Sequence, residues 1–181
     1  NHWVAAELAV FAKQFAANPL PGALVYLQYG PSQPEFLNLA GKAAEGFVWG
    51  TVYGAYADKQ GLAFRDAYRK EYLASGGVMG LVYTGGAYDT VKILAQNWKT
   101  ADPDNFDAVN AGLRKLTYRG VNGFYSFNNP QQAPKHYPLE VKDLEQGMAH
   151  LFVQVQNGQH KIISPSVLKE ATFKPAPWMA K

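Results

Sequence analysis

Residues able to do chemistry are few in this sequence and lie far apart. The 181 residues include no cysteine, which excludes thiolate nucleophiles, disulfides and cysteine-based zinc sites. The four histidines are His2, His136, His150 and His160, and none has the short spacing to another ligand that metal-binding helices use. Serines lie outside any Gly-x-Ser-x-Gly elbow, and Gly85-Gly86 forms no dinucleotide fingerprint. We therefore expect no enzyme activity, no catalytic residue, no metal and no cofactor.

Aromatic side chains are the more promising group, because several fall where predicted strands run out into loops. They are Tyr29, Trp49, Tyr53, Tyr83 and Tyr88. Any one of them taken alone is better explained by core packing. Together they suit a wall for an apolar or aromatic ligand, since the rings offer a wide contact area and tyrosine adds a hydroxyl for a polar tip.

The composition is that of a folded chain without a strong charge preference. Hydrophobic residues make up 48% and charged residues 17%, which excludes disorder over most of the length. The net charge of +3 is spread along the chain without a basic run, so we expect no nucleic-acid partner. No apolar stretch approaches the roughly 20 residues of a membrane helix. We expect a mature soluble chain, its signal peptide removed, or a piece of one.

Helices are predicted from the periodicity of apolar residues. They cover residues 4–15, 64–72, 88–98 and 102–116. In the third we expect Val91, Leu94, Ala95 and Trp98 to face inward. Asp102 is the expected N-cap of the fourth, with Pro103 after it, and Ser75-Gly76-Gly77 is expected to end the second.

Strands are predicted where short apolar runs end in glycine or proline. They cover residues 23–27, 47–53 and 123–127, with a hairpin of 151–155 and 161–163 around Asn157-Gly158. Continuous apolar runs are typical of parallel strands buried on both faces, so we expect 23–27 and 47–52 to be parallel neighbours. Strands and helices alternate, which predicts an α/β fold.

Several motifs in a fixed order resemble those of one family. They are Tyr29-Gly30, Pro34-Glu35-Phe36, Ala40-Gly41-Lys42-Ala43-Ala44-Glu45-Gly46, Gly86-Ala87-Tyr88-Asp89-Thr90-Val91, Gly120-Val121-Asn122-Gly123 and Pro175-Ala176-Pro177-Trp178-Met179. With their spacing, they resemble the leucine/isoleucine/valine-type periplasmic solute-binding proteins of ABC transporters, over nearly all of the chain. The resemblance implies a type I periplasmic-binding fold, with two lobes of parallel sheet flanked by helices and a hinge of several crossing segments.

The resemblance covers only the second half of such proteins, so most of the first lobe is missing from this sequence. It implies that residues 1–56 belong to the C-terminal lobe, 57–147 to the later part of the N-terminal lobe, and 148–181 to the C-terminal lobe again. The implied partners are a small solute, the missing half of the protein and an ABC permease, at the periplasmic or extracellular face of the membrane. Helices such as 102–116 should then expose apolar surface where the absent half packs.

The implied function is solute capture by hinge closure, without any bond being made or broken. Family members that bind amino acids typically carry an acidic residue where this sequence has Tyr29, so we expect an apolar or aromatic carboxylate without an amino group. A branched-chain amino acid is the alternative ligand, and a ligand-sensing domain of a receptor or regulator is the alternative function. The expected ligand contacts are Tyr29, Gly30, Trp49, Tyr53, Tyr83 and Tyr88, lining a cleft at the carboxyl ends of strands.

Overall fold

The protein is described by a computed structural model that covers residues 4–73, 79–137 and 141–179. Its α-helices are α1 (Ala5–Ala17), α2 (Glu35–Ala40), α3 (Lys59–Tyr72), α4 (Tyr83–Asn97) and α5 (Phe106–Lys115). Its strands are β1 (Tyr26–Gln28), β2 (Val48–Thr51), β3 (Thr117–Gly120), β4 (Gly123–Ser126), β5 (Leu151–Gln156) and β6 (Gln159–Ser164). Short 3-10 helices are η1 (Gly30–Ser32), η2 (Gly41–Ala44), η3 (Ser166–Leu168) and η4 (Pro177–Met179). The mixture of helices and strands confirms the α/β class.

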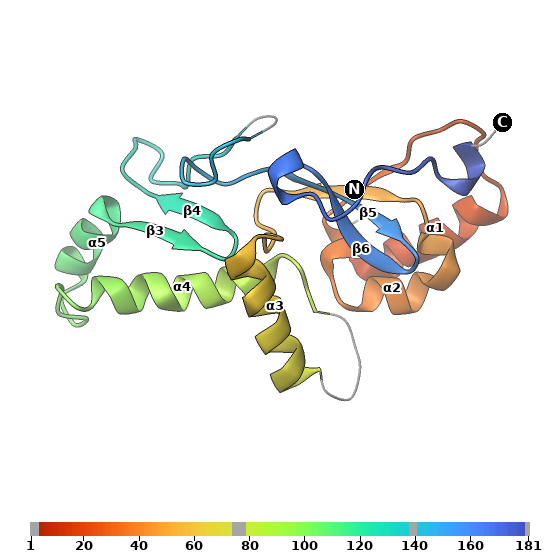
Figure 1. Ribbon diagram of the computed structural model, residues 1–181. Coiled ribbons are helices and arrows are strands. Elements are labelled where there is room, and N and C mark those ends of the chain that lie inside the picture. The colour runs from red at the N-terminus through yellow and green to blue at the C-terminus, as the bar shows by residue number, and fades with distance from the viewer. Residues whose placement is uncertain (1–3, 74–78, 138–140, 180–181) are drawn as a thin grey trace.

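Within the described residues, one sheet contains β1, β2, β5 and β6 in that order (Figure 1). β1 and β2 are parallel, as predicted, and β5 and β6 form the predicted antiparallel hairpin. One row of paired side chains crosses the whole sheet and is buried: Leu27, Trp49, Val153 and Ile162. This row shares a core with Leu8 of α1 and Phe36 of α2. Helices α1 and α2 therefore cover one face of the sheet.

The opposite face of β1 corrects one expectation. The run 23–27 was expected to be buried on both faces, but Leu24 is 62% exposed and Tyr26 is 47% exposed. In the described residues β1 is the edge strand of the sheet, and alternate side chains of a strand point to opposite faces. Only Leu27 of β1 therefore points into the core under α1 and α2.

A second group of elements has a core of its own. The β3–β4 hairpin packs with α4 and α5, and a separate cluster contains Ile93, Tyr125 and Met148 with Leu113 and Leu116 against it. Figure 1 shows this group at one end of the molecule and the four-stranded sheet with α1 and α2 at the other, with α3 between them. The two cores are what a chain divided between two lobes would build.

The helices of this second group differ from the expectation. The buried positions of α4 are Gly85, Asp89, Ile93 and Asn97, spaced by four. Val91 is 65% exposed and Trp98 is 47% exposed, so the predicted inward face is wrong. The true face is mostly small or polar, which an apolar pattern cannot find. At its end Asn97 donates to the carbonyl of Val109 in α5 at 3.0 Å.

Helix α5 begins later than expected, because its N-cap is Asn105 and not Asp102. The Asn105 side chain accepts from the backbone N–H of Ala108 at 3.0 Å, whereas Asp102 accepts from the backbone N–H of Asp104 in a local turn. Strand β3 was not predicted at all. The glycine C-cap expected at Ser75-Gly76-Gly77 lies outside the described residues.

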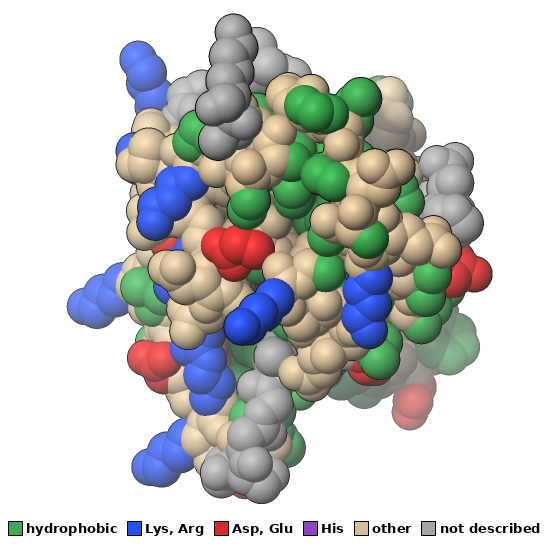
Figure 2. All heavy atoms as spheres, turned by 90° about the vertical axis from the view of Figure 1, so that its right-hand side faces the viewer, with side chains coloured by type: hydrophobic (Ala, Val, Ile, Leu, Met, Phe, Trp, Pro, Cys, Tyr) green, Lys and Arg blue, Asp and Glu red, His purple; other side chains and the backbone are tan. Residues whose placement is uncertain are grey.

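Large apolar side chains are exposed at both ends of the molecule. No residue of α5 is buried against the described part of the chain, and Phe106 at its start is 77% exposed. Figure 2 shows the end that carries α1 and α2, where hydrophobic side chains lie among several lysines and arginines and fewer acidic residues. Apolar surface of this kind is typical of a face that packs against further structure.

Candidate functional site

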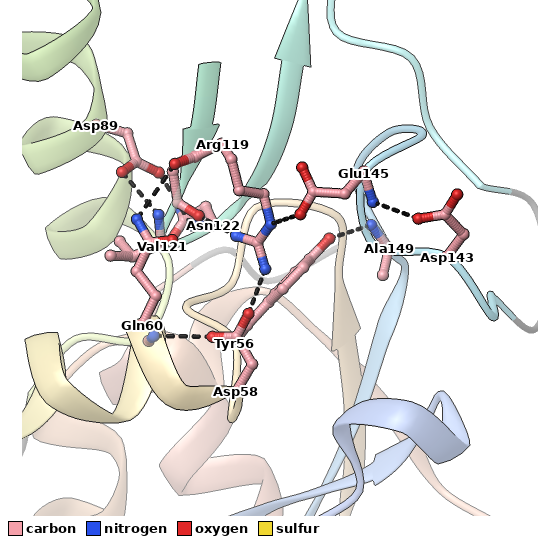
Figure 3. Close-up of polar contacts among 12 residues, drawn as sticks. Tyr56, Asp58, Gln60, Asp89, Arg119, Val121, Asn122, Asp143, Glu145 and Ala149 are labelled. Carbon is pink, nitrogen blue, oxygen red and sulfur yellow. Dashed lines mark hydrogen bonds and ion pairs between the residues drawn. The ribbon is translucent and has the colours of Figure 1, made fainter.

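Four distant segments of the chain meet beyond the end of β2, between the two cores. We call residues 53–58, 81–82 and 119–122, together with Ala149, the junction (Figure 3). The backbone N–H of Ala55 donates to the carbonyl of Leu81 at 3.0 Å, and that of Tyr56 donates to Val121 at 2.9 Å. The Tyr56 side chain is fully buried, and its hydroxyl accepts from the backbone N–H of Ala149 at 2.5 Å. The segment that leaves β2 is therefore fixed to both the segment before α4 and the β3–β4 turn.

Asp89 holds the β3–β4 turn against α4. Its carboxylate is fully buried and accepts from the backbone N–H groups of Val121 at 2.8 Å and Asn122 at 2.9 Å. It also accepts from the hydroxyl of Tyr125 at 3.0 Å. Burial raises the pKa of the Asp89 carboxyl, and these three hydrogen bonds act in the opposite direction. The carboxylate thus satisfies two backbone donors that the tight turn leaves unpaired.

Asn122 carries the same connection back to β2. Its amide nitrogen donates to the carbonyl of Tyr53 at 2.6 Å and to that of Val82 at 3.3 Å. Gly85 must be glycine for this contact, because a Cβ there would lie 2.1 Å from Oδ1 of Asn122. One side chain therefore joins the exit of β2, the start of α4 and the hairpin turn.

Arg119 adds an ionic contact at the outer side of the junction. Its guanidinium donates to the carboxylate of Asp58 and forms an ion pair with Glu145 at 3.3 Å. It also lies 5.1 Å from the centre of the Tyr56 ring, a cation–π distance. Asp58 is in turn the N-cap of α3, accepting from the backbone N–H of Gly61 at 2.8 Å. Burial raises the pKa of the Tyr56 hydroxyl to about 12.

A groove of about 410 Å³ lies next to the junction, between the chain that follows β1 and the helices α3 and α4. Ser32 and Gln33 line one side of it, and Tyr68, Tyr83 and Thr84 line the other. The backbone N–H of Leu81 donates to the carbonyl of Ser32 at 3.2 Å, so the two sides touch beside the groove. A groove with aromatic walls and hydroxyl groups at the carboxyl end of a parallel strand is a candidate ligand site.

The structure places three of the predicted tyrosines on the surface near this groove and the junction. Tyr83 is 71% exposed and lines the groove. Tyr53 is 41% exposed, and its ring meets that of His136 edge-on with centroids 5.5 Å apart. Tyr88 lies one turn further along α4, where its ring is 4.9 Å from that of Phe64. Tyr53 and Tyr88 do not line the same groove as Tyr83.

Tyr29 and Gly30 follow β1 directly and turn the chain toward the junction. Tyr29 has a φ of 30°, which is unusual for a residue with a side chain, and its ring is partly buried against the main core. Gly30 is buried against α1, because a Cβ there would lie 2.3 Å from Cδ1 of Leu8. The glycine is therefore explained by packing against α1.

Trp49 requires a correction. Its side chain is fully buried in the row that faces α1 and α2, so it has no surface for a ligand. Its indole N–H donates to Nδ1 of His160 at 3.1 Å. Burial lowers the pKa of His160 to about 4, so this imidazole is neutral and can accept the bond at pH 7. The sequence of β2 does not indicate which face of this strand the helices cover, because its side chains alternate between two faces.

The described residues offer no alternative site of metal or membrane type. No three histidine, aspartate or glutamate side chains of that part of the chain lie close enough to hold one ion. No described helix has the length and hydropathy needed to cross a membrane. Asp89 and Asn122 were not predicted as functional residues. The signal available was the four-residue spacing of Gly85 and Asp89 on a helix and the tight Gly120–Gly123 turn, neither of which is specific by itself.

Comparison with known proteins agrees with this architecture. The sequence matches the family described as periplasmic binding protein over residues 3–142. A solved structure named as a branched-chain amino acid ABC transporter from Silicibacter pomeroyi is 32% identical, with a TM-score of 0.81, over 98% of this chain and 46% of that one. A leucine-binding protein from Thermotoga maritima is 15% identical, with a TM-score of 0.64, over 89% of this chain and 42% of that one.

A third solved structure is an ABC-transporter solute-binding protein from R. palustris in complex with benzoate. It is 16% identical, with a TM-score of 0.58, over 92% of this chain and 42% of that one. No curated protein sequence matches this chain. The chain spans less than half of the length of these solved proteins. The match over most of its residues shows that it belongs to the periplasmic binding protein family and has the type I periplasmic-binding fold.

Proposed function

We propose that this chain is the second half of the solute-binding component of an ABC importer, and that the junction is part of its hinge. The observation that carries the proposal is the separation of the described residues into two apolar cores that are connected by the junction. Residues 1–56 and 148–181 are assigned to the C-terminal lobe and 57–147 to the N-terminal lobe. Most members of the two cores support this division, because the first contains residues of α1, α2, β1, β2 and β5, and the second contains Ile93 and Tyr125. Three members cross the proposed boundaries: Val82 and Val141 belong to the first core and Met148 to the second.

Hinge closure around a solute would act by differential affinity. A ligand that touches both lobes only when they are closed shifts the population toward the closed form, and about 5.5 kcal/mol changes a ratio of 1:99 to 99:1. Asp89 and Asn122 form most of their bonds in the junction with backbone groups, so rotation about neighbouring residues can leave these bonds intact. No covalent step is assigned to this protein.

Small-angle X-ray scattering of the full-length protein, with and without ligand, tests this proposal. We expect the radius of gyration to fall when ligand is added. A ligand that binds in calorimetry without any change in the radius of gyration would contradict closure. A permease partner and an extracytoplasmic location are part of the same proposal. Uptake of labelled ligand in cells with and without the adjacent permease would test them.

For the ligand we propose an apolar or aromatic carboxylate without an amino group. The support comes from Tyr29, which by the family resemblance stands where amino-acid-binding members carry an acidic residue, and from the exposed ring of Tyr83 in the groove. Tyr29 itself does not line the groove, and Glu35, which does, would favour an ammonium. An ammonium buried without a counter-charge is costly. A branched-chain amino acid is the alternative, supported by the name of the Silicibacter pomeroyi relative.

Two ligands that differ only in the amino group separate these alternatives. Leucine and 4-methylpentanoate share the apolar chain and the carboxylate, and calorimetry with each gives the contribution of the ammonium directly. We expect 4-methylpentanoate or benzoate to bind at least about tenfold more tightly than leucine. Tyr29→Glu should reverse the preference, and Tyr29→Phe, the matched control, should not. Tighter binding of leucine by the unchanged protein would establish the alternative.

A further inference from the structure

A second cavity of about 410 Å³ lies between α3 and the turn that joins β5 to β6. It shares no lining residue with the groove beside Tyr83. Its apolar lining comes from α2, α3 and the segment before α4, and consists of Leu37, Leu62, Met79 and Leu81. None of the predicted ligand contacts borders it.

Positive charge dominates the polar part of this cavity. Arg65, Arg69 and Lys161 border it, and Glu170 is the only carboxylate among the described residues that line it. His160 also borders it, but it is neutral at pH 7 because burial lowers its pKa to about 4. Arg69 has an exposed partner in Asp66 at 3.3 Å, and an exposed pair of this kind is weak. The cavity therefore carries an excess of positive charge.

Arg65 is the fixed element of the cavity. It is 4% exposed, donates to the carbonyl of Ala55, and pairs with Glu170 at 3.1 Å. Glu170 is shared, because its other oxygen accepts from the backbone N–H of Ile162 at 3.1 Å. Among the described residues no hydrogen-bond partner reaches Nε of Arg65. A buried guanidinium with an unused donor is an unusual feature, since buried polar groups are almost always paired.

We propose that this cavity is a binding site for a small oxyanion, phosphate or a short carboxylate, separate from the solute site. Arg65 provides a buried cation whose planar donors suit such anions, and Arg69 and Lys161 add two further cations to the lining. A bound anion would connect Arg69 of α3 with Lys161 of β6, next to the pair of Arg65 and Glu170. The proposal does not rest on the identity of the transported solute.

Calorimetry of the full-length protein with inorganic phosphate and, separately, with acetate tests the site, at an ionic strength held constant with chloride. The informative variant is Arg69→Gln with Lys161→Gln, because both side chains reach the rim and Arg65 is left in place. The matched control is Lys70→Gln with Lys169→Gln, which removes the same charge from exposed positions outside the cavity. Circular dichroism checks that both variants are folded.

We expect saturable binding of one or both anions, weakened at least about tenfold in the cavity variant and no more than about twofold in the control. The anion that binds more tightly identifies the oxyanion. Absence of saturable binding to the unchanged protein would mean that the cavity holds only water, and the proposal would be wrong. Equal weakening in both variants would also overturn it, because the effect would then be one of net charge.

Discussion

Replacing Asp89 by alanine tests the account of the junction most directly. The change removes the acceptor of three donors, the N–H groups of Val121 and Asn122 and the hydroxyl of Tyr125. All three donors belong to buried residues. An unsatisfied buried donor costs about 1–3 kcal/mol, so we expect the alanine variant to lose about 3–5 kcal/mol of unfolding free energy after partial relaxation.

Asparagine at the same position separates hydrogen bonding from charge. It keeps the shape and one acceptor oxygen but removes the buried charge, so we expect a loss of only about 1–2 kcal/mol. The pH dependence has a definite sign. Because burial raises the folded-state pKa of Asp89, its contribution to stability is greatest below the unfolded pKa and declines as the pH rises through the folded pKa. The unchanged protein should therefore lose stability relative to Asp89→Asn over that interval.

Urea unfolding of the full-length protein, followed by tryptophan fluorescence and circular dichroism, measures these differences. Asp104→Ala is the control, since this aspartate is exposed and its loss should cost less than about 0.5 kcal/mol. An alanine variant within about 1 kcal/mol of the control would refute the reasoning. So would an asparagine variant as unstable as the alanine variant, because the loss would then come from charge and not from unpaired donors.

Three further predictions concern the same region and the main core, each measured by urea unfolding. Gly85→Ala should lose at least about 2 kcal/mol of unfolding free energy, because the added Cβ would collide with Asn122. Gly86→Ala is the matched control in the same helix, where the added Cβ would lie 3.6 Å from Nδ2 of Asn122. Its unfolding free energy should be unchanged or rise by up to about 1 kcal/mol. Tyr56→Phe should lose about 1–2 kcal/mol of unfolding free energy, because it removes the buried hydroxyl that accepts from the N–H of Ala149. An unchanged unfolding free energy would show that this hydrogen bond does not stabilise the fold. The folded-state pKa of His160 lies below its unfolded value, so protonation of this residue favours the unfolded state. The unfolding free energy should therefore fall by about 3 kcal/mol from pH 7 to pH 4 because of His160. His160→Gln should remove this contribution to the pH dependence of stability.

The elements that sequence predicted correctly are those in which one apolar pattern determines the structure. The helix predicted at 4–15 is confirmed as α1, although of its expected apolar stripe Leu8 is buried, Phe15 is partly buried, and Val4 and Phe11 are exposed. The hairpin was predicted from Asn157-Gly158, and both residues have positive φ, 54° and 69°, as a two-residue hairpin turn requires. Parallel pairing of β1 and β2 follows from two short apolar runs separated by a connecting segment.

The parts that sequence missed depend on contacts between distant residues. The inward face of α4 consists of Gly85, Asp89 and Asn97 besides Ile93, and a polar buried face is explained only by its partners across the interface. Trp49 was placed in the ligand site because aromatic residues occur both in cores and in binding walls. Its burial depends on which face of the sheet α1 and α2 occupy, which no local pattern specifies.

Tyr53 contributes its backbone to the junction while its side chain lies at the surface. Its carbonyl accepts a hydrogen bond from the side chain of Asn122 at 2.6 Å. Its side chain is 41% exposed, and the one described aromatic ring that it contacts is that of His136. The bond that fixes the chain leaving β2 therefore involves the backbone of residue 53, which every amino acid supplies. A different side chain at this position would keep the bond and change the exposed surface. The geometry of the junction thus depends on Asp89 and Asn122, and the exposed ring of Tyr53 takes no part in it.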